Sequence, residues 1–158
     1  MSKYSTYEAE LEKHGRIIQP NRGASMLPLI RQNRDAMIIE RPKGRLKRYD
    51  CPLYKRADGK YVLHRILKVR AGDYVICGDN CTKKEYGITD DDIIGVLVGV
   101  IRDGKVISTD SKRYRLYVHL WCDLFYVRVV LLSVKRLVMR VLSGIKRIFT
   151  KKEKDRSE

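Results

Sequence analysis

The sequence predicts a mainly β, antiparallel fold with a short N-terminal helix and a basic amphipathic helical extension at the C-terminus. Two observations predict this fold class. From Ile17 to Ile107 the chain breaks into short apolar runs rich in β-branched and aromatic residues, separated by turn signals. From Ser111 onward the apolar residues recur at helical spacing instead. A length of 158 residues suits one domain with an appendage. We therefore expect a helical segment 1–16, a β domain 17–110, a basic amphipathic helical region 111–150 and a disordered charged tail 151–158.

The first segment carries helix start and stop signals. Ser5 and Glu8 have the spacing of a capping box, in which each side chain bonds the backbone N–H of the other residue. Gly15 suits the residue that ends a helix. The sequence therefore predicts a short helix between these signals.

The β region contains two hairpin signals. Asp58-Gly59 and Asp103-Gly104 each separate two apolar runs, and such dipeptides favour the tight turns that join antiparallel strands. In the run YVLHRILKV, strict alternation would place His64 on one strand face with Val62 and Ile66. The predicted strands lie in AMIIE, CPLYKR, YVLHRILKV, DYVICGD, IIGVLVGVI and KVIST.

The C-terminal region predicts a helix with one basic and one apolar face. At about 100° per residue, the cations fall in one sector and most apolar residues in the opposite one. Such a helix suits an anionic membrane surface, although packing on the protein itself would also cover its apolar face. The preceding YRLYVHLWCDLFYV is interrupted by His119 and Asp123 and has no charge-free run long enough to span a bilayer. The basic sector holds Arg128, Lys135, Arg136, Arg140, Lys146 and Arg147; the apolar sector holds Val130, Leu131, Val134, Leu137, Val138, Val141, Leu142, Ile145, Ile148 and Phe149.

Charge and cysteine content bound the environment. The formal net charge of +15 favours an anionic partner, either lipid headgroups or nucleic acid. The four cysteines have no disulfide or zinc-site spacing, so we expect reduced thiols, no metal site and no cofactor. The N-terminal MSKYSTYEAELEKHG lacks the apolar core of a signal peptide or anchor. We therefore expect a cytoplasmic protein, peripheral at the inner face of the membrane.

The segment RGASMLPLI, residues 22–30, contains a serine flanked by small and apolar residues. A serine becomes a useful nucleophile only where a base removes its proton and a third group holds that base. Of the three histidines, His64 lies in the β region with Ser25. Ser25 and His64 are therefore the candidate pair for acyl-transfer chemistry.

Five segments together resemble a known enzyme family. GASMLPLI, YDCPLYKR, VLHRI, YVICGDN and DDIIGVLVGV follow, in order and at similar spacing, the boxes of signal peptidase I and its clan, which includes the self-cleaving repressors. Histidine at the base position resembles the endoplasmic-reticulum and archaeal-like branch, whereas other members have lysine there. Only about sixteen residues precede the β region, too few for the DNA-binding domain of a repressor.

The resemblance implies a role for each matched residue. Ser25 attacks the scissile carbonyl, His64 acts as general base and then general acid, and Asp79 orients His64. Glu85 stands where that branch has a further acidic residue, and its longer side chain makes it the second choice for this role. Arg65 and Asn80 are expected to be structural supports.

Residues around Ser25 are candidates for binding the substrate. Gly23 and Ala24 leave room for an extended peptide, and Met26 suits a packing or pocket position. Pro28 stiffens the turn. The Ser25 backbone N–H is the expected oxyanion donor, and Gly23 stands where many bacterial relatives have a second, hydroxyl donor.

We therefore expect a serine endopeptidase that cleaves an extended peptide or precursor protein after small residues. The alternative is a non-catalytic protein of the same fold that binds anionic membrane or nucleic acid through its basic C-terminal helix. Aromatic and basic residues alternate in KRYRLYVHLW, but in a helical pattern rather than on an open sheet, so nucleic-acid binding is the weaker expectation. The oligomeric state is left open.

Overall fold

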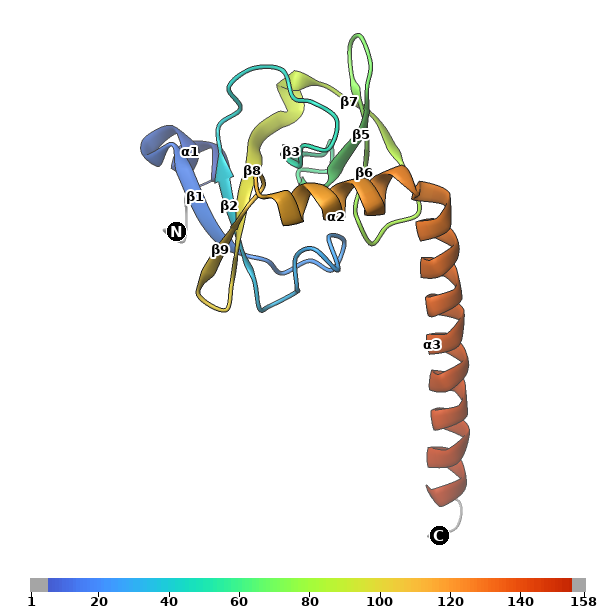
Figure 1. Ribbon diagram of the computed structural model, residues 1–158. Coiled ribbons are helices and arrows are strands. Elements are labelled where there is room, and N and C mark those ends of the chain that lie inside the picture. Colours follow the sequence, from blue (N-terminus) through green and yellow to red (C-terminus); the bar gives the residue numbers. More distant parts are fainter. Residues whose placement is uncertain (1–5, 155–158) are drawn as a thin grey trace. The chain divides into compact units, whose positions relative to one another are not determined.

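The structure, a computed structural model, describes residues 6–154, with side chains for residues 6–143 (Figure 1). The chain divides into two compact units, residues 1–123 and 124–158. The first unit holds all strands and the helices α1 (Tyr7–His14) and α2 (Lys112–Asp123), and the second consists of α3 (Phe125–Lys154). The fold class expected from the sequence, mainly antiparallel β with a short N-terminal helix and C-terminal helices, is confirmed. Helix α2, which lies after the expected boundary at residue 110, belongs to the same compact unit as the strands.

Helix α1 begins one residue later than its sequence signal suggested. The Thr6 side chain accepts the N–H of Ala9 at 3.3 Å, so Thr6 is the N-cap, and Ser5 lies outside the described residues. Gly15 ends the helix with φ +67, the left-handed conformation in which glycine is favoured. The predicted helix is thus present, and its end is the predicted one.

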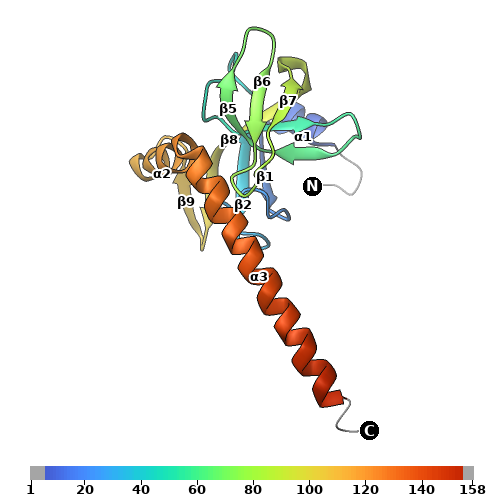
Figure 2. The same cartoon turned by 90° about the vertical axis from the view of Figure 1, so that its right-hand side faces the viewer.

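The strands form two antiparallel sheets. The larger sheet has the order β1-β2-β8-β3-β4, with β9 also paired to β8, and the smaller has the order β5-β6-β7. The smaller sheet faces the reader in Figure 2. Both predicted hairpins occur, β3–β4 and β8–β9. In chain order the strands are β1 (Arg16–Pro20), β2 (Ala36–Glu40), β3 (Pro52–Lys55), β4 (Tyr61–Leu63), β5 (Arg65–Val69), β6 (Tyr74–Cys77), β7 (Glu85–Ile88), β8 (Ile93–Arg102) and β9 (Lys105–Ser108), with a 3₁₀ turn at Asp90–Asp92.

The run YVLHRILKV is not one strand, so the predicted alternation about His64 is wrong. It divides into β4, which pairs with β3 of the larger sheet, and β5, which pairs with β6 of the smaller one. Leu63 packs in the core beneath the larger sheet, and Ile66 packs in a second core with Tyr54 and Tyr74. Because the two apolar residues belong to different cores, the chain changes sheets at His64.

Helix α2 packs against the strands of the first compact unit, residues 1–123, which is called the strand unit below. Tyr114, Val118 and Cys122 recur at helical spacing and are buried against Leu29 and Leu67. These residues form a third, smaller hydrophobic core. The helix therefore packs against β5 and against the segment that precedes β2.

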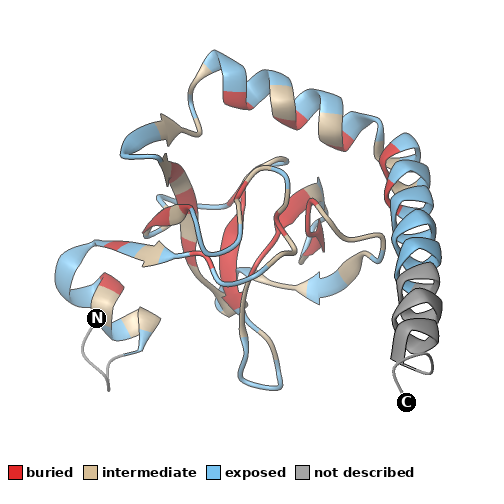
Figure 3. Cartoon of the chain, turned by 90° about the horizontal axis from the view of Figure 1, so that it is seen from below, coloured by how far each residue is buried: buried red, intermediate tan, exposed pale blue. Residues whose placement is uncertain are grey.

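Helix α3 differs from its prediction in two respects. It continues through residues 151–154, which we expected to be disordered. Arg128, expected on the exposed basic face, is buried, and its guanidinium carbon lies 4.8 Å from the centre of the Phe125 ring. Most of the remaining described surface of α3 is exposed (Figure 3). The side chains of Ile145, Lys146, Arg147, Ile148 and Phe149 lie outside the described residues.

Among the described residues, no single helix is long and apolar enough to cross a membrane. The consecutive helical segments Lys112–Asp123 and Phe125–Ser143 meet the length and composition requirement only when they are taken together.

Candidate active site

Ser25 and His64 line the same pocket, which has a volume of about 910 Å³. Ser25 lies in the turn between β1 and β2, and His64 lies where the chain passes from β4 to β5. Gly23, Met26 and Cys81 also line the pocket. The fold thus brings together two residues that are far apart in the sequence.

Glu85 holds the His64 ring. The Nδ1 atom of His64 lies 2.7 Å from Oε1 of Glu85, the first residue of β7. An ionised carboxylate only accepts hydrogen bonds, so Nδ1 carries the proton and Nε2 keeps its lone pair. That lone pair makes Nε2 the basic atom of the ring.

The Glu85 carboxylate is itself fixed by two neighbours. The Tyr54 hydroxyl donates to Oε2 at 2.9 Å, and Arg56 donates to both oxygens at 2.7 and 2.9 Å. Tyr54 is fully buried in β3, and Arg56 follows that strand. The carboxylate therefore bridges the two sheets as well as holding His64.

The electrostatic environment keeps His64 neutral and Glu85 charged at neutral pH. Burial lowers the pKa of His64 below its ordinary value, and the nearby Glu85 carboxylate offsets only part of that shift. Burial alone would raise the pKa of Glu85, but hydrogen bonds from Arg56 and Tyr54 outweigh it and the pKa is lowered. A neutral imidazole facing a pocket beside a serine can accept its proton.

Asp79 lies in a different arrangement from the one expected. It forms a buried, bidentate ion pair with Arg65, at 2.8 and 2.9 Å, and both side chains are 0% exposed. Asp79 was the first choice to orient His64, but Glu85 is the residue that accepts a hydrogen bond from His64 Nδ1. The longer side chain of Glu85 reaches His64 from β7, whereas Arg65 occupies both carboxylate oxygens of Asp79.

Helix α2 adds two further contacts to Asp79. The Tyr117 hydroxyl donates to Oδ2 at 3.0 Å, and Trp121 Nε1 donates to the Asp79 backbone carbonyl at 2.8 Å. The rings of Tyr117 and Trp121 stack at 6.0 Å between their centres. These aromatic residues, considered earlier as nucleic-acid contacts, therefore hold the loop that follows β6.

The loop that follows β6 also holds the turn between β1 and β2 that carries Ser25, called the serine turn below. The backbone N–H of Asn80 donates to the Ser25 carbonyl at 2.7 Å, and its side-chain Nδ2 donates to the Ala24 carbonyl at 3.1 Å. A Cβ on Gly78 would lie 2.7 Å from the Ser25 carbonyl oxygen and 2.8 Å from His64 Nε2. Gly78 therefore lets both candidate catalytic residues approach one point.

The serine turn is braced by Asn21, and the Ser25 hydroxyl and backbone N–H have no protein acceptor among the described hydrogen bonds. The buried Asn21 side chain accepts the Gly23 N–H at 3.2 Å and donates to the Gly23 carbonyl at 2.8 Å. Among the described hydrogen bonds, neither the hydroxyl nor the backbone N–H of Ser25 has a protein acceptor, and none joins Ser25 to His64. Catalytic hydrogen bonds of this kind often tighten only with substrate bound.

The four residues predicted to bind substrate separate into two groups. Gly23 and Met26 line the pocket, and Met26 is also buried in the core beneath the turn. Ala24 and Pro28 are not among the lining residues: the Ala24 carbonyl is bonded to Asn80, and Pro28 is exposed after a cis peptide bond. Pro28 therefore shapes the turn rather than the pocket.

Several residues of the site were missed by sequence reasoning. Tyr54 and Arg56 lie in YDCPLYKR, which was matched to a family box and to a strand without a role for either side chain, and Tyr117 and Trp121 lie in a segment interpreted as a separate helix. The signal available was the pair of polar groups at Tyr54 and Arg56 near the end of the predicted strand CPLYKR. Their pairing with Glu85 depends on contact between the two sheets, which no local pattern specifies.

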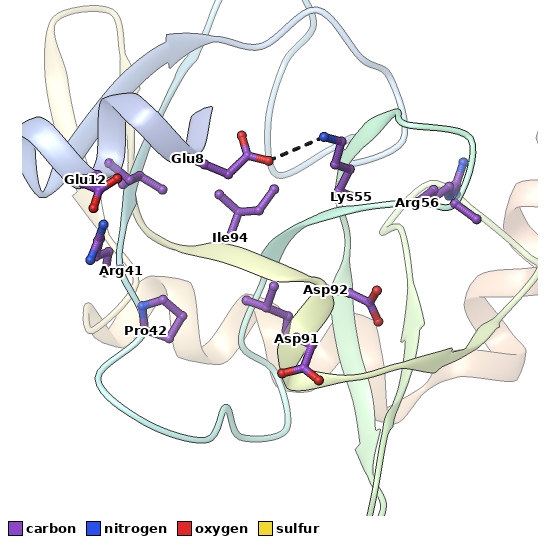
Figure 4. A pocket seen from close by; sticks show the side chains of 12 residues that line it. Glu8, Glu12, Arg41, Pro42, Lys55, Arg56, Asp91, Asp92 and Ile94 are labelled. Carbon is purple, nitrogen blue, oxygen red and sulfur yellow. Dashed lines mark ion pairs between the residues drawn. The ribbon is translucent and has the colours of Figure 1, made fainter. Parts of the chain in front are cut away.

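A second pocket, of about 660 Å³, lies near α1 (Figure 4). Its charges oppose one another: Glu8 is 3.7 Å from the Lys55 amino group, and Asp91 and Asp92 face a lining that also contains Arg41. Among the described residues, no group of three or more His, Cys, Asp or Glu side chains could hold a metal ion. The Ser25 pocket is therefore the stronger candidate for chemistry.

Comparison with known proteins identifies no relative: no protein-family model, curated protein or solved structure matches this chain significantly.

Proposed function

We propose that the protein is a serine endopeptidase with Ser25 as nucleophile and His64 as general base. The observation that carries the proposal is the hydrogen bond between His64 Nδ1 and Glu85, which leaves Nε2 as a base in the pocket that Ser25 lines. The resemblance of its sequence segments to the boxes of the signal peptidase I clan supports the same chemistry.

The reaction follows from these positions. His64 Nε2 takes the Ser25 hydroxyl proton as the Ser25 oxygen attacks the peptide carbonyl. The Ser25 backbone N–H stabilises the oxyanion, and His64 then protonates the leaving amine. A water molecule, deprotonated by His64, hydrolyses the acyl-enzyme. Glu85 is a positioning residue that favours the imidazolium formed in each step.

The substrate we propose is an extended segment of a peptide or precursor protein with small side chains before the scissile bond. The pocket of about 910 Å³ is lined by apolar residues, among them Met26, Met37 and Leu53, and also by polar residues, among them Arg22 and Arg56. The apolar part of this lining accommodates small or apolar side chains. Asp79, Arg65 and Asn80 act in this proposal as supports of the serine turn.

The test is cleavage of a peptide panel by the native chain and by Ser25→Ala and His64→Ala. Matched controls are Ser133→Ala and His14→Ala, which change an exposed serine and an exposed histidine outside the pocket. We expect both site variants to lose cleavage and both controls to keep it. Cleavage that survives in the site variants would overturn the assignment. A folded native chain that cleaves nothing in the panel would favour a non-catalytic protein of this fold.

The proposal includes a cytoplasmic location at the inner face of the membrane. The four cysteines are present as thiols, the state that a reducing compartment maintains. Protease protection of the strand unit in sealed cells, with loss of protection on lysis, is the expected result. Digestion in intact cells after removal of the outer wall would contradict it.

A further inference from the structure

The described part of α3 exposes an apolar strip. Its seven members range from 49% exposed at Val138 to 61% at Leu137. At about 100° per residue they share one sector of the helix, and a contiguous exposed apolar patch marks a surface that another apolar medium covers. The strip, named here the α3 strip, consists of Val130, Leu131, Val134, Leu137, Val138, Val141 and Leu142.

Cations border the α3 strip on both sides. Lys135 falls next to the Leu142 edge of the sector, and Arg140 falls beyond the Leu137 edge. Both are exposed, as is Arg136. Long basic side chains beside an apolar strip can extend toward headgroups while their aliphatic stems lie on the apolar layer.

The charge of α3 distinguishes between the two surfaces that could cover the α3 strip, a second copy of the chain and a lipid membrane. From Leu124 to Ser143 the sequence contains no Asp or Glu, so nothing on this stretch repels an anionic surface. A second copy of the same strip would bring its own cations close to these. An anionic lipid surface offers apolar chains for the strip and phosphate groups for the cations.

We propose that α3 binds in the interface of anionic membranes through the α3 strip, with Lys135, Arg136 and Arg140 contacting lipid phosphates. Arg128 is not one of these cations, because it is buried against Phe125. The binding does not depend on the proposed peptidase activity, since no residue of the Ser25 pocket takes part.

The experiment measures binding of the full chain to vesicles by flotation. The vesicles contain either phosphatidylcholine alone or an equimolar mixture with phosphatidylglycerol. Lys135→Gln/Arg140→Gln removes the bordering cations, and Lys105→Gln/Lys112→Gln removes two exposed cations from the strand unit as a matched control. Leu137→Ser/Val141→Ser tests the strip, and circular dichroism checks that each variant is folded.

We expect tight binding only to the anionic vesicles, lost at high salt. Each bordering cation contributes roughly fivefold, so Lys135→Gln/Arg140→Gln weakens binding by about 25-fold while the control loses far less. Leu137→Ser/Val141→Ser abolishes binding. Ser25→Ala binds as the native chain does, so failure of the peptidase proposal would leave this result unchanged.

Three results would overturn the proposal. Equal binding to neutral and anionic vesicles would remove the role of the cations. Resistance to alkaline carbonate extraction would indicate insertion across the bilayer instead. A dimer in solution that Leu137→Ser/Val141→Ser dissociates, without vesicle binding, would show that a second copy covers the α3 strip.

Discussion

Replacing Glu85 by glutamine tests which acidic residue positions His64. The substitution keeps the side-chain length but removes the negative charge that accepts the Nδ1 proton at 2.7 Å. A hydrogen bond to a charged group contributes about 1.5–3 kcal/mol and a neutral one about 1 kcal/mol, so the imidazolium loses roughly 1–2 kcal/mol of stabilisation. That loss lowers the pKa of His64 further below its ordinary value.

Two kinetic consequences follow for Glu85→Gln. The rate kcat/KM falls at least about tenfold, because imidazolium develops in the transition state. If the glutamine amide nitrogen faces Nδ1, the proton moves to Nε2, and the loss approaches the roughly 10⁴-fold effect known for an aspartate-to-asparagine change in a Ser-His-Asp protease. The acid limb of the pH profile, already below the ordinary histidine pKa, moves to lower pH.

The assay is kcat/KM against pH on a cleaved peptide, with the His64 pKa followed by NMR and stability followed by urea unfolding. Glu85→Asp is the control that separates charge from side-chain length, because it keeps the carboxylate and shortens the side chain. Activity of Glu85→Gln within twofold of native, with an unmoved acid limb, would refute the reasoning. An acid-limb shift in folded Asp79→Asn instead would return the role to Asp79.

Three further outcomes are expected. Asp79→Asn leaves a buried guanidinium without its carboxylate and lowers the unfolding free energy by about 3–5 kcal/mol in urea titrations; a loss under 1 kcal/mol would show that the pair is dispensable. Gly78→Ala places a Cβ 2.7 Å from the Ser25 carbonyl oxygen and 2.8 Å from His64 Nε2, so activity falls more than tenfold and the melting temperature falls with it; native kinetics would contradict the close approach. Burial opposes ionisation of Asp35, but Arg102 and Arg31 lower its pKa to about 2, so stability falls by about 2 kcal/mol as pH drops from about 4 through 2; Asp35→Asn should flatten this fall in acid unfolding curves.

The elements that could be predicted from sequence are those with local causes. The β8–β9 hairpin follows from Asp103 and Gly104, whose φ values of +49 and +76 suit the tight turn expected there. Gly15 ends α1 for a similar reason. By contrast, β7 was missed because EYGI is short, has no clear alternation and contains Gly87 at φ +74.

The candidate site could be predicted only in part. Ser25, His64 and Glu85 were all named as candidates from sequence, because motif order places them at matching positions. The choice between Asp79 and Glu85 was reversed by the contacts observed, since the partner of a carboxylate depends on which side chains the sheets bring within about 3 Å.

The sequence by itself determined the antiparallel β class, the candidate nucleophile and base, and a C-terminal helix with unbalanced positive charge. These depend on periodicity, turn residues and composition, which act over a few neighbouring positions. Only the tertiary structure decided that the chain changes sheets at His64, that Glu85 and not Asp79 holds its Nδ1, and that α2 packs on the loop carrying Asp79. Those facts depend on contacts between residues far apart in the chain, and such contacts are set by packing of the whole strand unit.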